Sequence, residues 1–349
     1  MTQKESHKNI TFMKTIISTK YIKNTVLAAA ALFAVSATAQ EEEESSPLSL
    51  SGSVDTYYRT ALTTSDADGT VDPGTSFANE TGFALGMANL IASYEKGSVG
   101  AVADVVFGPR GDDATGGYNL NQLYAYWNVS EGTTLTMGRF NTFLGYEVIA
   151  PAANFNYSTS YLFSNGPFSH VGLKADFGLS DDMSLMLAVM NVTDVNNNLT
   201  GAYSLGAQLG FYDQFINLYY DGGEALGFEI DYTGGFDLSD DFFLGINAAL
   251  ATNDGSGFYG AALYPQYSTS ENFALGLRGE YFAFTQDEGD DAPVLALTLT
   301  GSYSVDNLII KPEIRLDSWG NDIEPYTDND LAATNSLATF AIAAIYSFD

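Results

Sequence analysis

The chain consists of runs of about ten residues in which apolar and polar side chains alternate, each run followed by a break. Alternation with a period of two is typical of β-strands that have one apolar and one polar face. The breaks also alternate, between short ones such as 130–133 and usually longer, acidic or Gly-rich ones such as 109–119. Short turns at one end and longer loops at the other predict an all-β fold, a transmembrane antiparallel β-barrel.

Sixteen runs are predicted to be strands, an even number that places both termini at the periplasmic, short-turn end. A total of 14 or 18 strands remains an alternative, because only a very short Gly-Gly loop separates the runs 215–221 and 225–235. The predicted strands are 48–59, 81–94, 99–108, 120–129, 134–145, 168–178, 183–191, 201–212, 215–221, 225–235, 242–252, 257–268, 273–284, 293–303, 308–318 and 336–348.

Two features favour a membrane barrel over a soluble β-sandwich, which would show the same alternation. The polar face of 308–318 carries the opposed charges Lys311, Glu313 and Arg315 in mid-strand, as expected beside a water-filled lumen. Tyr and Phe residues also gather near the ends of the runs, where the aromatic girdles of a membrane barrel lie. The sandwich stays as the alternative fold.

The first residues have the features of an export signal. Lys14, Lys20 and Lys23 precede the apolar run 26–35, and Ala37-Thr38-Ala39 is a small-residue cleavage site. We therefore predict a signal peptide at 1–39, an acidic linker at 40–47 and one barrel domain at 48–349. The apolar run is too short for a membrane-spanning helix.

The charge of the chain excludes one class of partner. Removal of the leader takes away five of 13 basic and one of 43 acidic residues, which leaves 8 and 42 and a net charge of −34. Such a chain is not expected to bind nucleic acid through its phosphates. The absence of Cys rules out disulfides and thiolate metal sites.

Residues 120–195 carry the motifs Gln122-Leu-Tyr124, Gly138-Arg-Phe140, Leu144-Gly-Tyr-Glu147, Asn154-Phe-Asn-Tyr-Ser158, Tyr161-Leu-Phe163, His170-Val-Gly172 and Val189-Met-Asn191. In these motifs the chain resembles the OmpL-like β-barrel porin family of Gram-negative bacteria. The resemblance implies a pore in the outer membrane that passes small hydrophilic solutes by diffusion. It also implies contact with outer-membrane lipid and lipopolysaccharide. The resemblance to sixteen-stranded porins implies a homotrimer. The chain departs from the family pattern at Tyr157-Ser158-Thr159, where the family typically has Arg as the third residue.

The last strand carries Phe340, Tyr346 and Phe348 on one face. This resembles the C-terminal signal that is read by the barrel-assembly machinery, which we expect to be a partner. The chain departs from that signal by ending in Asp349 rather than in the aromatic residue.

The connection 146–167 is too long for an ordinary hairpin loop and is the third external loop by our count. By resemblance to trimeric porins, it is a candidate to fold inward and narrow the lumen. The candidate constriction residues near it are Arg139, whose facing is uncertain, Glu147, Asn154, Asn156, Tyr157 and Tyr161. The candidate lumen residues on the strands are His170, Lys174, Glu229, Asp231, Arg278, Glu280, Lys311, Glu313 and Arg315.

The lumen charges are nearly balanced, whereas the loops are acidic. A fixed negative charge at the mouth raises the local concentration of cations, so we expect a mild cation preference. By alternation the lumen has the acids Asp55, Asp104, Glu229, Asp231, Glu280, Glu313 and Asp317, and the bases Arg59, Lys174, Arg278, Lys311 and Arg315.

Enzymatic function is not expected. His170 is the one His outside the leader, and Ser169 beside it points to the opposite face of the strand, which argues against a Ser-His-Asp triad with Asp176. A hydrolase and a non-conducting structural or adhesive barrel remain as alternatives. No cofactor is predicted. The acidic loops are candidates for loosely bound Ca²⁺ or Mg²⁺, with solvated charge as the favoured interpretation.

Overall fold

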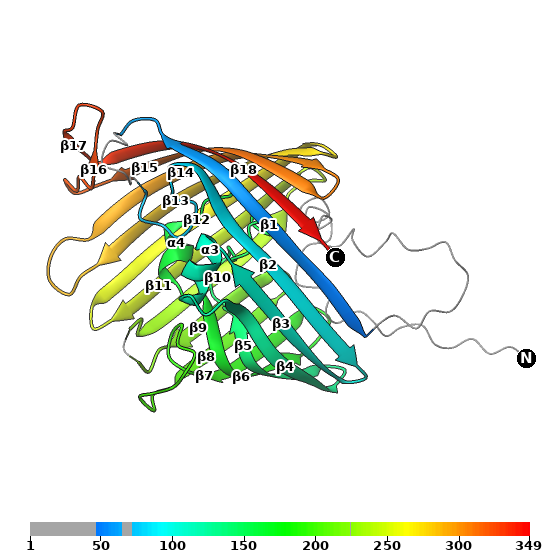
Figure 1. The fold of residues 1–349 in the computed structure, drawn as a ribbon. Helices are drawn as coiled ribbons and strands as arrows, with labels where there is room; N and C mark the ends of the chain where they lie inside the picture. The colour runs from blue at the N-terminus through cyan, green and yellow to red at the C-terminus, as the bar shows by residue number, and fades with distance from the viewer. Residues whose placement is uncertain (1–46, 65–71, 224) are drawn as a thin grey trace, which may run out of the picture.

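A computed structural model describes residues 47–64, 72–223 and 225–349. The predicted signal peptide and almost all of the acidic linker lie outside these residues. Within the described part, sixteen antiparallel strands form one closed barrel, in which each strand pairs with its neighbours in sequence and β1 closes the ring with β18 (Figure 1). Closure leaves no strand edge unpaired, as a sheet in lipid requires.

All sixteen predicted strands are confirmed, with different ends. The largest differences are at β5, which ends at Asn141 instead of 145, and at the starts of β8 and β10. The barrel strands are β1 (Leu48–Ala61), β2 (Gly82–Lys96), β3 (Val99–Phe107), β4 (Leu120–Ser130), β5 (Thr133–Asn141), β6 (Ser169–Gly178), β7 (Met183–Met190), β8 (Ser204–Phe211), β9 (Gln214–Tyr220), β10 (Phe228–Asp237), β11 (Phe242–Asn253), β12 (Ser256–Ser270), β13 (Phe273–Thr285), β14 (Ala292–Val305), β15 (Leu308–Trp319) and β18 (Ser336–Phe348).

Four small elements in the loops were not predicted. The helices α3 (Pro109–Thr115) and α4 (Tyr161–Asn165) lie in the connections that follow β3 and β5. The strands β16 (Tyr326–Thr327) and β17 (Ala333–Thr334) form a hairpin in the connection between β15 and β18. Both helices sit inside the ring of strands (Figure 1). No helix among the described residues is long and apolar enough to cross a membrane.

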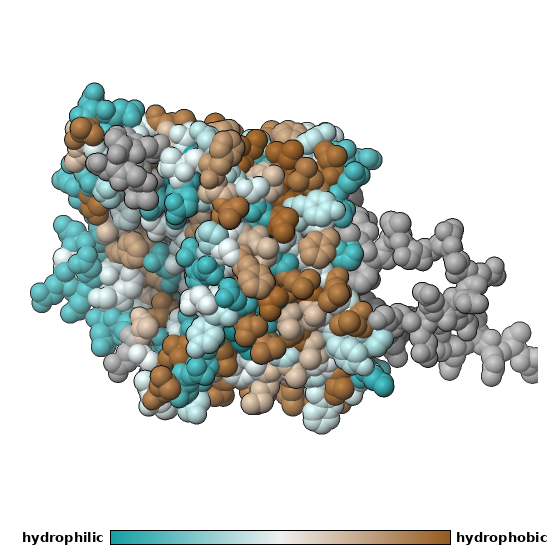
Figure 2. Space-filling view, viewed as in Figure 1, coloured by the Kyte–Doolittle hydropathy of each residue, from teal (hydrophilic) through white to brown (hydrophobic). Residues whose placement is uncertain are grey.

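The two faces of the barrel differ in the way that alternation predicts. On β14, Leu297 is 41% exposed on the outside, whereas its neighbour Thr298 is fully buried on the inside. The space-filling view shows many apolar side chains over the outer face of the strands, and hydrophilic ones gathered at the end with the long loops (Figure 2). An apolar outer face around a polar interior is the arrangement that lipid selects.

Simple alternation fails at one position of β4. By simple alternation, Asn121 would share the outer face of β4 with Leu123, but Asn121 is buried and donates to the Asp104 carboxylate (2.7 Å). The cause is a β-bulge, because Asp104 pairs with Gln122 and Val105 pairs with Leu120, which leaves Asn121 as an extra residue. A bulge puts two residues opposite one and breaks the period of two.

Candidate functional site

The connection between β5 and β6, residues 142–168, is here called L3. It enters the barrel and crosses to the opposite wall, where carboxylates hold its backbone. Glu313 on β15 accepts hydrogen bonds from the amides of Tyr157 (2.8 Å) and Ser158 (3.1 Å). Glu280 on β13 accepts from the amides of Tyr161 (3.0 Å) and Leu162 (2.8 Å). Each carboxylate thus binds two successive amides of the loop.

The Glu280 contacts follow from the local structure of the loop. Tyr161 and Leu162 open the helix α4, whose first amides have no partner within the helix. Ser160 caps it, with its side chain accepting from the Phe163 amide (3.0 Å). A carboxylate near a helix N-terminus is favoured by the unpaired amides there, so Glu280 completes the cap from the wall.

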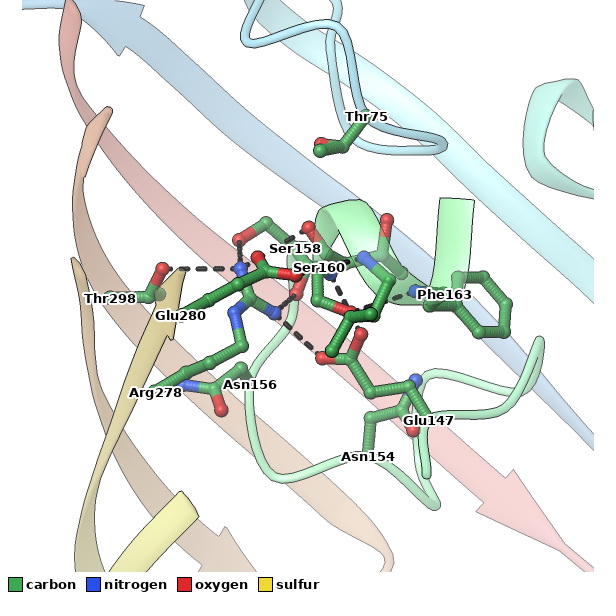
Figure 3. Close-up of polar contacts among 12 residues, drawn as sticks. Thr75, Glu147, Asn154, Asn156, Ser158, Ser160, Phe163, Arg278, Glu280 and Thr298 are labelled. Carbon is green, nitrogen blue, oxygen red and sulfur yellow. Dashed lines mark hydrogen bonds and ion pairs between the residues drawn. The ribbon is translucent and has the colours of Figure 1, made fainter. Parts of the chain in front are cut away.

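Two arginines hold the carbonyls of the same segment, and Figure 3 shows the contacts of one of them, Arg278. Arg278 on β13 donates to the Ser158 carbonyl (2.6 Å) and forms an ion pair with Glu147 (2.6 Å). Arg315 on β15 donates to the Thr159 carbonyl (2.8 Å) and pairs with Asp317 (2.8 Å). Both guanidinium groups are almost fully buried. Such buried charges are tolerated because each is paired and hydrogen-bonded.

Glu147 also organises L3 from within, since it accepts from the Ser160 amide (2.7 Å) as well as from Arg278. Asn154 closes a turn of the loop by two hydrogen bonds to the backbone of Val148. Its side-chain oxygen accepts from the Val148 amide (2.9 Å), and its side-chain nitrogen donates to the Val148 carbonyl (2.6 Å). Asn156 donates to Thr300 on β14 (2.7 Å). These three predicted residues therefore lie together in one network.

Lys311 on β15 donates to the Pro151 carbonyl (3.2 Å) and to the Asn154 carbonyl. Tyr157 donates its hydroxyl to Asp55 on β1 (2.5 Å), and the Tyr161 hydroxyl reaches the Pro73 carbonyl (2.6 Å). Burial raises the pKa of both Tyr157 and Tyr161, so both phenols stay protonated and act as donors at neutral pH.

Glu229 and Asp231 lie on β10, also beneath L3. Asp231 accepts hydrogen bonds from the Gly145 amide (3.1 Å) and from the side chains of Asn217 and Asn247 (both 2.6 Å). Glu229 is buried, and its Oε2 atom has no hydrogen-bond partner among the described residues.

The other three predicted residues lie apart from this network. Arg139 donates to the Asn121 carbonyl (3.2 Å) and to Asn196 (2.5 Å). His170 is buried among Phe140, Phe143 and Tyr219 rather than facing an open lumen. Lys174 is partly exposed and pairs with Asp176 (2.8 Å).

The residues that a Ser-His-Asp triad would need have other partners. His170 lies 3.0 Å from the Thr142 hydroxyl, whereas Ser169 donates to Asp194 (3.3 Å). Asp176 is paired with Lys174. Among residues 47–64, 72–223 and 225–349, no three His, Asp or Glu side chains come together as a metal site.

Sequence reasoning missed several contacts of L3 and of the arginines that hold it. Arg110 on α3 is buried and donates to the carbonyls of Ile149 (3.2 Å) and Tyr157 (3.1 Å). Thr75 accepts from Arg315 (3.0 Å) across 240 positions of the chain. Thr159 is fully buried and donates to the Ser76 carbonyl, so the position where the family has Arg is enclosed. One signal was available: Arg110 is the only basic residue in the external loops.

A closed membrane barrel whose longest loop is bound inside the lumen belongs to the porin class, and its location is the outer membrane. The chain is a member of the family described as “Putative beta-barrel porin-2, OmpL-like”, whose model matches residues 47–348. The predicted family is thereby confirmed. No curated protein matches the sequence.

Solved structures share the fold. The chain is similar to the outer membrane channel DcaP of Acinetobacter baumannii (14% identity, TM-score 0.56, 86% of this chain and 97% of that one). It is also similar to OmpT of Vibrio cholerae (12% identity, TM-score 0.52, 86% and 97%) and to an anion-selective porin from Comamonas acidovorans (10% identity, TM-score 0.55, 86% and 99%). The family favours a channel over an enzyme.

Proposed function

We propose that this porin passes small hydrophilic solutes by passive diffusion, with a mild preference for cations, and that it is not an enzyme. One observation carries the preference: the basic side chains of the inner wall are occupied by other groups. Arg278, Arg315 and Lys311 are buried against carbonyls of L3. Arg59 is buried and donates to the Asn79 carbonyl (2.7 Å). Lys174 is paired with Asp176.

The external loops add negative charge without adding free positive charge. Their one basic residue, Arg110, is buried against L3. In contrast, acidic side chains are exposed in three of these loops, among them Asp112, Asp113, Asp287, Glu288, Asp290, Asp322, Glu324 and Asp330. An anion approaching the mouth therefore meets fixed charge of its own sign, and field focusing in a low-dielectric wall strengthens this effect.

The test is a reversal potential in a planar bilayer with a KCl gradient. We expect a potential of the sign that K⁺ selectivity gives, and a smaller one for a variant with Asp287, Glu288 and Asp290 changed to their amides. A matched control changes Asp181 and Asp182, exposed acids of a periplasmic turn, to Asn. A reversal potential of the opposite sign would refute the preference.

We further propose that L3 forms the constriction, because it is hydrogen-bonded to inward-facing side chains of β1, β10, β13, β14 and β15. Deleting 154–161 is expected to raise single-channel conductance. Unchanged conductance in a folded barrel would place the constriction elsewhere. The second candidate function is a non-conducting structural or adhesive barrel, which is favoured by the number of contacts that hold L3 inside the lumen. It is the better explanation if the intact protein inserts into the bilayer but never conducts.

For its surroundings, we propose outer-membrane lipid and lipopolysaccharide, assembly by the barrel-assembly machinery and a homotrimer. The trimer is supported by one similar structure, described as a trimer form of Vibrio cholerae OmpT (12% identity, TM-score 0.53, 86% of this chain and 99% of that one). Cross-linking of the protein in outer-membrane vesicles tests it. A single band at monomer mass, where a control trimeric porin cross-links, would refute it.

A further inference from the structure

Part of the first external loop, the connection between β1 and β2, lies against L3. This part, residues 73–80, is here called the strap. The Ser76 amide donates to the Ser164 hydroxyl (2.8 Å), and the Ser76 carbonyl accepts from the Thr159 hydroxyl. Thr159 is fully buried at this contact. The strap therefore covers a segment of L3 that is also bound to the wall of the barrel.

A side chain of the wall joins the strap to the same segment. Arg315 donates to the Thr75 hydroxyl (3.0 Å) as well as to the Thr159 carbonyl (2.8 Å). From L3, the Tyr161 hydroxyl donates to the Pro73 carbonyl (2.6 Å). These bonds and those of Ser76 place the strap and L3 in one hydrogen-bonded layer, in which a movement of L3 disturbs the strap.

The one aromatic side chain of the strap packs on L3. The Phe77 ring lies 5.8 Å from the ring of Phe163 and 5.6 Å from that of Phe168, measured between centroids. The Arg110 guanidinium lies over the same ring, 4.9 Å from its centroid. Phe77 is 3% exposed. Aromatic pairs and cation–π contacts of this kind stabilise a packed state beyond the area that they bury.

The backbone of the strap is strained where it carries this ring. Phe77 and Ala78 both have left-handed conformations, with φ of 68° and 58°. Residues with a Cβ atom disfavour this region, so such a conformation persists only where the surrounding contacts over-determine it. A strap that loses its contacts with L3 relaxes to an ordinary conformation. The docked and the released strap are thus two distinct conformations, and backbone strain favours the released one.

We propose that the strap locks L3 in its docked position and that the strap must leave before L3 can undock. Thr75, Ser76 and Phe77 are then positioning residues for the constriction, which they control without lining it. The inference rests on the proposed function only where it assigns the constriction to L3. Whether the strap protects L3 is a separate question, which can be tested without any measurement of conduction.

The first test measures access to L3. In Thr159→Cys the single thiol of the chain lies under the strap, because the sequence has no Cys of its own. Its rate of reaction with a water-soluble maleimide is measured on the folded protein in detergent micelles. Addition of Phe77→Ala should raise this rate at least about tenfold, from the loss of two aromatic contacts and one cation–π contact.

Phe83→Ala is the matched control, because Phe83 is a Phe of the following strand that is 92% exposed on the lipid face. It should leave the rate unchanged. Equal rates with and without Phe77→Ala, in barrels whose heat-modifiable gel mobility shows that they are folded, would overturn the proposal.

The second test locks the strap reversibly. Ser76→Cys combined with Ser164→Cys puts two thiols where a hydrogen bond now joins the strap to L3. In single-channel recordings, the oxidised channel should lose the brief increases in conductance that reduction with dithiothreitol restores. The two single variants are the controls and should not respond to oxidant or reductant.

Two thiols that fail to cross-link in the folded barrel would show that the strap is not seated on L3, and would overturn the proposal. Equal fluctuations in the oxidised and the reduced channel would also overturn it. A protein that conducts in neither form would refute the proposed function instead, and the maleimide rates would still decide whether the strap protects L3.

Discussion

The contact between Glu313 and L3 offers a direct test of whether the anchoring of the loop controls the pore. Glu313 accepts from the amides of Tyr157 and Ser158 and from the Thr300 hydroxyl (2.7 Å). In Glu313→Gln, one acceptor oxygen remains, and the new NH₂ group must face an amide that is itself a donor. The variant thus loses at least one charge-assisted bond and gains a donor–donor contact.

The magnitude follows from those losses. A hydrogen bond to a charged group contributes about 1.5–3 kcal/mol, and an unpaired buried amide adds a penalty, so the docked loop should lose about 2–4 kcal/mol. Because about 1.4 kcal/mol is a factor of ten, the fraction of time that this segment of L3 spends undocked should rise by about 30- to 700-fold. The barrel itself should remain, since its strand ladder is untouched.

The assay is single-channel recording in a planar bilayer, with open-channel noise and conductance as readouts. We expect Glu313→Gln to be noisier than wild type and to have a higher mean conductance. Asp104→Asn is the matched control, because Asp104 is also a buried wall carboxylate but is bound by Asn121 (2.7 Å) and not by L3. Conductance and noise that equal those of wild type in a correctly folded Glu313→Gln barrel would refute the reasoning.

Three further predictions concern the rest of the wall. Arg278→Met should leave the buried Glu147 without its ion-pair partner and lower the free energy of unfolding by about 3–5 kcal/mol, measured by urea titration in vesicles; a loss below 1 kcal/mol would contradict it. Leu297→Arg places a charge on the lipid face of β14 and should cost about 2–4 kcal/mol in the same titration, with Leu297→Ile near neutral as the control. His170→Phe keeps the contacts with Phe140 and Phe143 and loses the Thr142 hydrogen bond, about 1 kcal/mol; a loss above 3 kcal/mol would show that the ring has a further partner.

The sequence was sufficient to predict the ring of strands, because a side chain that faces lipid and one that faces the lumen differ at every second position. Lys311, Glu313 and Arg315 could be placed inside on this basis alone. The break at Asn121 could not, since a bulge depends on the pairing of Asp104 with Gln122 and leaves the composition of β4 unchanged.

The network around L3 was beyond sequence reasoning for a different reason. Alternation assigns a residue to a face but does not give its partner, and most partners here are backbone atoms of a loop without periodicity. Glu280 was predicted as a lumen charge, whereas it binds the first amides of α4 from 118 and 119 positions away. Arg110 was overlooked because it lies in a short loop helix, outside any strand pattern.

The distance in sequence between L3 and its anchors has a consequence for folding. The loop follows β5, but Glu280, Glu313 and Arg315 lie on β13 and β15, so these three anchors are in position only after the last third of the barrel has formed. Contacts between such distant segments form only after the entropy of a long closed loop has been lost. We therefore expect L3 to dock late in the folding of the barrel. A docked L3 then marks a barrel whose C-terminal strands have already paired.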